Sequence, residues 1–182
     1  MDEKQLLTAC RNGDRKAQKM LFEMFAPKMY GVCLRYAKDE DTAQDYLQEG
    51  FIRVFSHLGN FRHEGSLEGW VRRIIVNTAL EKLRKTDIFK NSLEVETALN
   101  KASDGAQVID QINTADLLQL IQSLPSGFRT VFNLYAIEGY THQEIGDLLR
   151  ISEGTSKSQY SRARQWLQQR IIQKEKSDGK AR

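Results

Sequence analysis

Polar and basic side chains suited to nucleic-acid recognition cluster between residues 153 and 164. This stretch reads EGTSKSQYSRAR and combines hydroxyl, amide, ammonium and guanidinium groups at helical spacing. Such groups hydrogen-bond to base edges in the major groove and to phosphate oxygens. We expect the DNA-facing residues of this segment to be Thr155, Lys157, Ser158, Gln159, Ser161, Arg162 and Arg164.

The residues just before this segment predict a helix-turn-helix. The stretch GYTHQEIGDLLRIS provides a short amphipathic helix and a turn at Ile151 and Ser152. Thr141 and Glu144 have the spacing of a capping box, and Ser152 stands where it can cap the second helix. The small Gly146 lets the two helices approach closely. Since the second helix of this motif lies in the major groove, we predict a DNA-binding unit.

Charge is distributed unevenly along a chain whose formal net charge is only +3. Residues 150–182 hold nine Lys and Arg against three Asp and Glu, and residues 70–90 hold six against two. Residues 39–49 carry five acids and no base, and residues 87–116 carry six acids against two bases. The pattern indicates two DNA-facing surfaces separated by a segment that avoids DNA.

Composition excludes several classes of protein. The 182 residues are 40% hydrophobic and 28% charged, with only two prolines, which suits an all-helical chain. No apolar run approaches the roughly 20 residues that span a bilayer, and no signal-peptide core is present, so we expect a cytoplasmic protein without membrane insertion. Cys10 and Cys33 match no metal-ligand spacing and are expected to be reduced, packed side chains. We predict no metal and no cofactor.

Helical periodicity predicts an all-α fold with two small helical domains. Asp14 and Ser66 are expected N-caps, Pro27 should kink or interrupt the second helix, and Gly59 should end the third as a C-cap. The expected helices cover residues 3–11, 15–38, 42–58, 67–85, 110–123 and 126–137, followed by the helix-turn-helix. Residues 87–109 lose the periodicity and are interpreted as a flexible acidic linker between domains at 1–86 and 110–182.

Three segments, in this order, resemble an extracytoplasmic-function (ECF) sigma factor, a two-domain member of the bacterial sigma-70 family. AQDYLQEGFIRVF is similar to the helix of that family that binds RNA polymerase. NFRHEGSLEGWVRRIIVNTALEKLRK resembles the segment that opens and reads the −10 promoter element. LPSGFRTVFNLYAIEGYTHQEIGDLLRISEGTSKSQYSRARQWL resembles the −35-reading domain, and its GTSKSQ spelling is similar to sigma factors of Bacteroidetes-type bacteria.

The resemblance implies partners and surfaces for this chain. It implies a promoter-specificity subunit that binds RNA polymerase core and has no catalytic chemistry of its own, held inactive in many relatives by an anti-sigma factor. The third helix would dock on a basic coiled coil of the largest polymerase subunit through Asp41, Asp45, Gln48 and Glu49. On spacing alone, an acidic helix start that complements the helix dipole remains open. The linker would thread the active-site cleft of the polymerase, although ordinary linker solubility gives the same composition.

A second implied surface captures the melted −10 strand. Single-strand binding uses aromatic faces for stacking and cations for phosphates, and an unstacked base needs a pocket. Phe61 is expected to stack, whereas Trp70 lies on the apolar face and is expected to pack in the core. The candidates are Asn60, Phe61, Arg62, His63, Glu64, Arg72, Arg73, Asn77, Arg84 and Lys85.

The third implied surface reads the −35 duplex. Lys157, Ser158 and Arg162 are the expected base contacts, while Thr155, Arg164 and Arg129 are expected phosphate contacts. Tyr160 and Trp166 should anchor the helix to its own domain. The chain departs from the family pattern at three positions, where the family often has Gly or Asn in the turn, an apolar residue, and a base: Arg150, Ser156 and Gln159.

Two alternatives compete with the sigma factor hypothesis. A repressor or activator with a sensing or dimerising N-terminal half would also carry a helix-turn-helix, but a sensor has no need of the basic face and Asn77 at residues 67–85. An enzyme would need a catalytic constellation. The sequence contains no Gly-rich phosphate loop, no Ser/His/Asp arrangement and no metal-ligand cluster.

Overall fold

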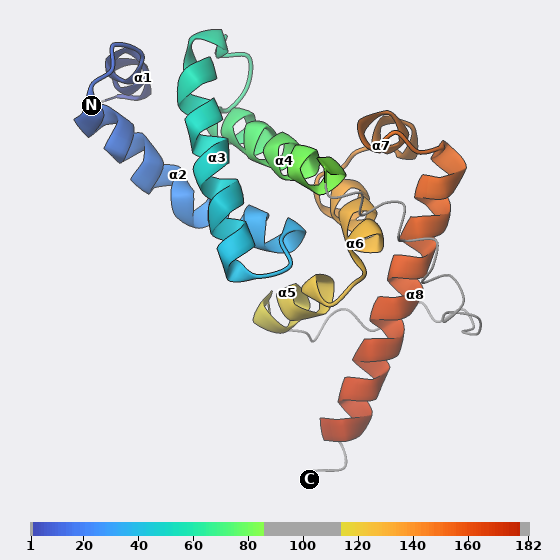
Figure 1. Cartoon of the computed structure of the whole chain (residues 1–182). Helices are drawn as coiled ribbons and strands as arrows, with labels where there is room; N and C mark the ends of the chain where they lie inside the picture. Colours follow the sequence, from blue (N-terminus) through green and yellow to red (C-terminus); the bar gives the residue numbers. More distant parts are fainter. Residues whose placement is uncertain (1, 86–113, 179–182) are drawn as a thin grey trace. The chain divides into compact units, whose positions relative to one another are not determined.

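The computed structural model describes residues 2–85 and 114–178. Within these two ranges all regular structure is helical, as predicted. The chain divides into two compact units, Met1–Leu83 and Arg84–Arg182 (Figure 1). The acidic linker expected at residues 87–109 lies outside the described residues.

Local caps set the start of the first two helices. Helix α1 (Glu3–Arg11) begins at a capping box, in which the Asp2 carboxylate accepts from the Gln5 N–H while the Gln5 side chain accepts from the Asp2 N–H. Helix α2 (Arg15–Tyr36) begins at Asp14, whose carboxylate accepts from two backbone N–H groups of the first turn. The sequence predicted both starting points, because each depends only on residues within one turn.

The remaining helices of the first unit close its core. They are α3 (Glu40–His57), the short 3₁₀ helix η1 (Leu58–Asn60) and α4 (Leu67–Lys85). A Cβ at Gly50 would collide with Cδ1 of Ile75, so this glycine permits the close approach of α3 and α4. Each fully buried aliphatic side chain contributes about 1.5–3 kcal/mol. The largest fully buried side chains of this unit are Tyr36 and the apolar residues Leu7, Leu21, Met29, Val54, Leu58, Val71, Ile75 and Leu80.

Two breaks expected from single residues of this unit are not found. Of the kink or interruption expected at Pro27, the interruption does not occur, because α2 continues through this residue. Pro27 is exposed, so solvent can hydrate the carbonyl that loses its helical partner. Gly59 is not a left-handed C-cap, because α3 passes instead into η1 with Leu58 in right-handed helical conformation. The limits predicted for α1 and α4 are confirmed, and α3 begins two residues before its predicted start because Asp39 caps it.

The second unit packs short helices along one long helix. Helices α5 (Thr114–Gln122) and α6 (Ser126–Phe132) lead into a π-helical turn, η3 (Asn133–Ile137). The sequence predicted one continuous helix from 126 to 137 and missed this change of winding. The core cluster joins α5, α6 and the long helix α8 (Glu153–Asp178) through Leu120, Leu124, Phe128, Phe132, Ala163, Trp166 and Leu167.

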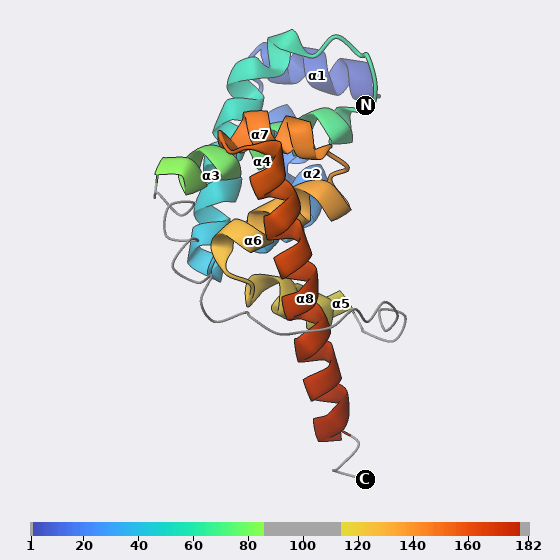
Figure 2. The ribbon, with the colours of Figure 1, turned by 90° about the vertical axis from the view of Figure 1, so that its right-hand side faces the viewer.

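The predicted helix-turn-helix is confirmed, with α8 as its second helix. Helix α7 (His142–Leu149) begins with the predicted capping box of Thr141 and Glu144. The Ser152 hydroxyl accepts from the Thr155 N–H at 2.9 Å and so caps α8. A Cβ at Gly146 would lie 2.9 Å from the Ile151 carbonyl oxygen, which shows how closely the turn passes. Figure 2 shows α7 beside the beginning of α8, with α6 and α5 farther along it.

Arg150 ends α7 in the left-handed conformation, with φ 58° and ψ 43°. This conformation is strained for residues with a Cβ and relaxed for Gly. The departure from Gly or Asn noted in the sequence therefore has a local energetic cost, while the fold of the turn is retained.

We predict that Arg150→Gly stabilises the second unit by about 0.5–1 kcal/mol, because it relieves the left-handed strain. Thermal unfolding followed through Trp166 fluorescence in a Trp70→Phe background measures this change. Arg150→Ala is the control, since it removes the charge and keeps the strain. An equal gain in both variants would attribute the effect to charge instead.

Candidate nucleic-acid and docking surfaces

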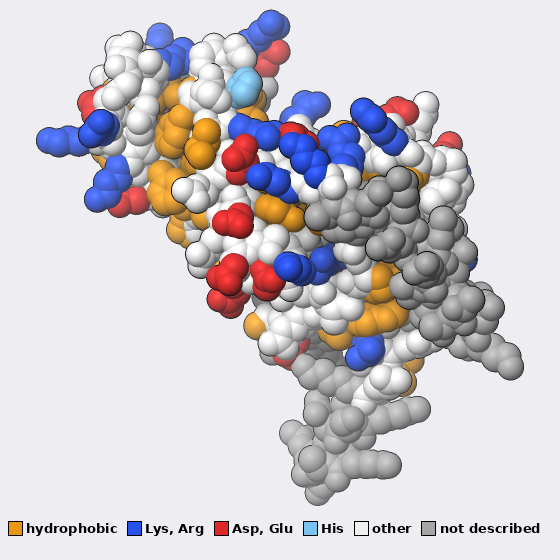
Figure 3. Space-filling model, viewed as in Figure 1, with side chains coloured by type: hydrophobic (Ala, Val, Ile, Leu, Met, Phe, Trp, Pro, Cys, Tyr) orange, Lys and Arg blue, Asp and Glu red, His pale blue; other side chains and the backbone are white. Residues whose placement is uncertain are grey.

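An acidic stripe lies on the exposed side of α3. Asp41, Asp45 and Gln48 are all exposed and follow one another at i, i+4 and i+7, so they share one face of the helix. In Figure 3 Asp and Glu side chains (red) gather over the beginning of α3. The stripe exposes carboxylate and amide oxygens on one face of α3, at the positions that the family resemblance implied.

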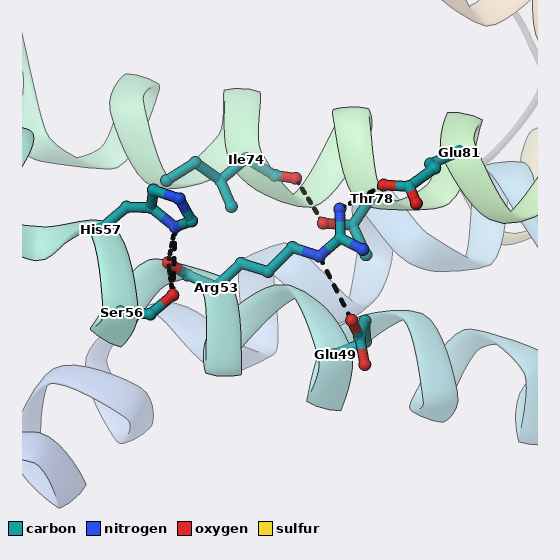
Figure 4. A network of polar contacts seen from close by, with 7 residues as sticks. All are labelled: Glu49, Arg53, Ser56, His57, Ile74, Thr78 and Glu81. Atoms are coloured by element: carbon teal, nitrogen blue, oxygen red, sulfur yellow. Dashed lines mark hydrogen bonds and ion pairs between the residues drawn. The ribbon is translucent and has the colours of Figure 1, made fainter.

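Glu49 differs from its three companions because it belongs to an ion-pair network inside the unit. Its carboxylate accepts from Arg53 Nε at 3.2 Å, and Arg53 Nη1 donates to Glu81 on α4 (Figure 4). The Glu81 hydrogen bond raises the pKa of Arg53 above its usual value. Both acids are about one-third exposed. Glu49 therefore helps to join α3 to α4, and as placed it is not a free acid of the stripe.

Ile52 extends the stripe, and sequence reasoning missed it. Its side chain is 58% exposed, which is high for a large aliphatic residue. It stands four residues after Gln48 and so continues the same face. The i, i+4 spacing could have identified it, but an isoleucine within an amphipathic helix is normally interpreted as a core residue.

The loop before α4 holds an aromatic cluster whose arrangement corrects one expectation. Phe61 is 5% exposed, and its ring lies 5.5 Å from that of Trp70 and 4.7 Å from that of His63. In this conformation Phe61 does not offer a face for base stacking. Trp70, which we expected in the core, is half-buried instead. The burial of the two rings is therefore the reverse of what we expected, with Phe61 the more deeply buried of the two.

The other loop candidates are on the surface. Asn60, Arg62, His63 and Glu64 are exposed. His63 adopts a left-handed φ of 59°, and Gly65 follows with a φ of 108°. Non-glycine residues in this region are uncommon, and they concentrate at functional sites where the surrounding structure holds them.

Helix α4 presents a polar and basic face beside this loop. Arg73, Asn77 and Arg84 are exposed and recur at i, i+4 and i+11, so they lie on one side of the helix. Lys85 is exposed at the last residue, whereas Arg72 is half-buried. Figure 3 shows Lys and Arg side chains (blue) along α4. Guanidinium groups beside an amide suit contacts to phosphates and bases.

Helix α8 exposes four of the eight predicted −35 residues on one face. Lys157, Ser158, Ser161 and Arg164 are exposed, while Arg162 is half-buried at the edge of that face. Lys157 forms an exposed ion pair with Glu153 at 2.7 Å, which contributes little and exchanges readily. Thr155 is half-buried, and its hydroxyl lies 2.8 Å from that of Ser152 in the helix cap.

Two residues that we expected to contact DNA are buried. Arg129 is 4% exposed, and its Nη1 donates to the Gln122 carbonyl at 2.8 Å, so its guanidinium joins α6 to α5. Gln159 is 8% exposed and faces the inside of the unit. Helical phase explains the second case, because Gln159 lies on the same side of α8 as the buried Ser156 and Ala163.

A polar contact inside the helix-turn-helix joins its two helices. Ser156 is fully buried, and its Oγ lies 3.0 Å from Nδ1 of His142. The imidazole stacks on Tyr135 at 4.2 Å and 9°, and Tyr160 lies 4.5 Å from Tyr135. His142 thus satisfies the serine that stands where the family often has an apolar residue. Tyr160 anchors α8 to its own unit, as predicted.

Burial lowers the pKa of His142 below its usual value, and the Lys157 charge adds to this effect against an opposing contribution from Glu153. The neutral imidazole is therefore the form that the folded unit favours. An unfolded chain takes up the proton first, so stability is complete above about pH 6.5 and falls as the pH drops toward the folded pKa.

We predict that acidification from pH 7 to pH 5 destabilises the second unit of the wild type more than that of His142→Gln, which carries no titrating group at this position. Thermal unfolding reported by Trp166 in the Trp70→Phe background measures the difference. NMR titration of the imidazole should give a pKa below 6.5. The same dependence of unfolding temperature on pH in both proteins would show that His142 is not the group responsible.

Features of other protein classes are missing from the described residues. Among them, no group of three or more His, Cys, Asp or Glu side chains is arranged to hold a metal ion. None of the described helices combines the length and apolar character needed to cross a membrane. Cys10 and Cys33 are both free and buried, as predicted.

Comparison with known proteins identifies the family. Sigma-70 region 2 matches residues 21–88, and Sigma-70, region 4 matches residues 114–167. The chain is 31% identical to the RNA polymerase sigma-H factor of Pseudomonas aeruginosa, over 90% of each chain. It is 28% identical to the ECF RNA polymerase sigma factor SigW of Bacillus subtilis, over 92% of this chain and 96% of that one.

A solved structure shares the fold. In the complex of the sigma factor RpoE with the anti-sigma factor NepR from Bartonella quintana, the matching chain is 18% identical, with a TM-score of 0.51 over 85% of this chain and 96% of that one. The full-length relatives and the two sigma-70 regions lead to one conclusion. The chain belongs to the sigma-70 family, as an ECF sigma factor that binds RNA polymerase core and directs promoter-specific transcription initiation.

Proposed function

We propose that the chain performs this function through three separate surfaces: the stripe on α3, the loop and basic face at α4, and the exposed face of α8. The observation that carries the proposal is that each surface is exposed on its own helix at helical spacing. Residues 1–86 would bind core and the −10 element, and residues 110–182 would read the −35 element.

The α3 stripe docks on a basic coiled coil of the largest polymerase subunit. Asp41, Asp45 and Gln48 supply charge and acceptors, and Ile52 supplies an apolar contact at the end of the stripe. Opposite charges at such an interface steer association and fix orientation. Glu49 contributes indirectly, because its bond to Arg53 supports the guanidinium that donates to Glu81 on α4.

The loop and α4 capture single-stranded −10 DNA. An unstacked base needs a pocket and a stacking partner, and the half-buried ring of Trp70 offers more surface for that contact than the buried Phe61. The polar edge of the pocket comes from Asn60, Arg62, His63 and Glu64. Phosphate and base contacts along the strand come from Arg72, Arg73, Asn77, Arg84 and Lys85.

Helix α8 lies in the major groove of the −35 duplex. Lys157, Ser158 and Arg162 are the proposed base contacts, with Lys157 leaving Glu153 for the DNA. Ser161 lies on the same face. Thr155 and Arg164 are the proposed phosphate contacts that set the register.

Further features of the family fit the same proposal. The chain works in the cytoplasm, has no reaction of its own, and is held inactive by an anti-sigma factor that covers its polymerase-facing surfaces. The GTSKSQ spelling supports an origin in Bacteroidetes-type bacteria. The acidic residues at 87–109 occupy the polymerase cleft as the linker.

We predict that the wild type co-elutes with bacterial RNA polymerase core in physiological salt, and that Asp45→Lys weakens this binding about tenfold or more, or about 1.4 kcal/mol. The reason is that attraction to the basic coiled coil becomes repulsion. Size-exclusion chromatography and a fluorescence titration against core measure both.

Glu23→Lys is the matched control for this experiment. It makes the same change of charge at an exposed site on α2 and breaks only a surface pair with Lys19. If both variants weakened binding to core equally, the effect would come from the net charge of the protein and not from the α3 stripe. A wild-type chain that binds duplex DNA as a dimer and ignores core would favour the repressor or activator hypothesis.

We predict that Arg162→Ala costs about 1–3 kcal/mol on promoter duplex and much less on random duplex, because it removes a base contact. Arg164→Ala should weaken binding to both duplexes equally and reduce the salt slope by about one. Competition binding over a salt series separates the two effects. An equal loss of affinity for promoter and random duplex in Arg162→Ala would show that Arg162 contacts phosphates instead of bases.

A further inference from the structure

Arg11, the last residue of α1, holds the loop that precedes α4. Its Nε donates to the Leu58 carbonyl at 3.2 Å, and its Nη2 donates to the Phe61 carbonyl at 3.2 Å. The contacts join residues 47 and 50 positions apart in the chain. They are therefore tertiary contacts between an N-terminal helix and the start of the proposed −10 loop.

These two carbonyls lie at the end of α3 and η1, and the Leu58 carbonyl accepts from the Phe61 N–H at 3.3 Å as well as from Arg11. Leu58 follows the end of α3, where the last carbonyls of a helix lack intrahelical partners and carry the negative end of the helix dipole. A guanidinium is a rigid planar donor that can serve two acceptors at once and always carries its charge. A lysine ammonium retains the charge but cannot reproduce this fixed pair of bonds.

The position of Phe61 governs the rest of the loop. Its carbonyl is held by Arg11, while its ring is buried against Trp70 and His63. His63 in turn has the left-handed backbone conformation, which persists only when its surroundings hold it. Arg11 thus fixes the backbone end of a cluster that controls how far Trp70 and the exposed loop side chains reach.

We propose that Arg11 is a positioning residue for −10 recognition, which sets the loop from Leu58 to Gly65 in its strand-capturing conformation. This inference rests on the proposed function of that loop. The residues matched by sigma-70 region 2 begin at 21, so α1 lies outside them. The role of α1 is then to support the −10 surface from outside the matched segment, without touching DNA.

The test uses the full chain with three substitutions: Arg11→Ala, Arg11→Lys and, as control, Arg15→Ala. Arg15 is exposed at the first residue of α2 and leaves the loop contacts intact. Amide hydrogen exchange of residues 58–66 reports the loop without any ligand. Binding of holoenzyme to a fluorescent single-stranded DNA, selected from a random pool on the wild-type holoenzyme, reports strand capture. Co-elution with core reports docking.

We expect Arg11→Ala to accelerate loop exchange about tenfold and to weaken strand binding about tenfold, equivalent to 1.4 kcal/mol. Arg11→Lys should lose about threefold in each assay, because its charge remains favourable at the end of α3. Arg15→Ala should match the wild type, and core binding should be unchanged in all three. Arg11→Lys also preserves the test if Arg11→Ala folds poorly.

Three outcomes would overturn the inference in distinguishable ways. Unchanged loop exchange in Arg11→Ala would show that Arg11 does not hold the loop, and would leave the proposed −10 function intact. Faster exchange spread evenly over α2, α3 and α4 would make Arg11 a general stabilising residue. Faster loop exchange with undiminished strand binding would show that the loop is not the strand site, and the proposed −10 function would fail with it.

Discussion

The backbone groups at helix ends are the constraint on which the rest of this structure depends. Every helix leaves N–H groups unpaired at its start and carbonyls unpaired at its end, and a chain of short helices has many such ends. The starts of six helices receive side-chain oxygens from Asp2, Asp14, Asp39, Ser66, Thr141 and Ser152. These caps also fix the phase of each functional surface. A shift by one residue turns a helical side chain by about 100°, enough to move Asp45 or Ser158 off its face.

The same constraint explains which elements could be predicted from the sequence. Caps are local, so the limits of α1 and α4 and the turn before α8 follow from residues a few positions apart. The local features that the sequence did not predict depend on distant partners or on solvent. Pro27 is tolerated because it faces water, and the end of α3 needs no left-handed glycine because η1 continues the chain and Arg11 supplies donors from another helix. The π-helical winding of η3 is accompanied by the stacking of Tyr135 on His142, a contact that no local pattern contains.

The candidate surfaces divide in the same way. Helical spacing was enough to select exposed positions such as Asp41 and Asp45 on α3 or Lys157 and Ser161 on α8. It was not enough for Arg129, which spans two helices, or for Glu49, whose partner Arg53 also reaches α4. Residue type gave the wrong burial twice. Isoleucine is usually buried and glutamine usually exposed, but Ile52 is exposed and Gln159 is buried. In each case the deciding information lies in a neighbouring helix.

The contact between His142 and Ser156 couples the energetics of two positions on different helices. An apolar residue at 156 would leave the imidazole without its partner, and an apolar residue at 142 would leave a hydroxyl sealed in the interior without one. Either change alone passes through a less stable protein, whereas the paired change does not. A polar and an apolar version of this helix-turn-helix core are therefore each self-consistent, whereas a mixture of the two leaves one polar group without its partner.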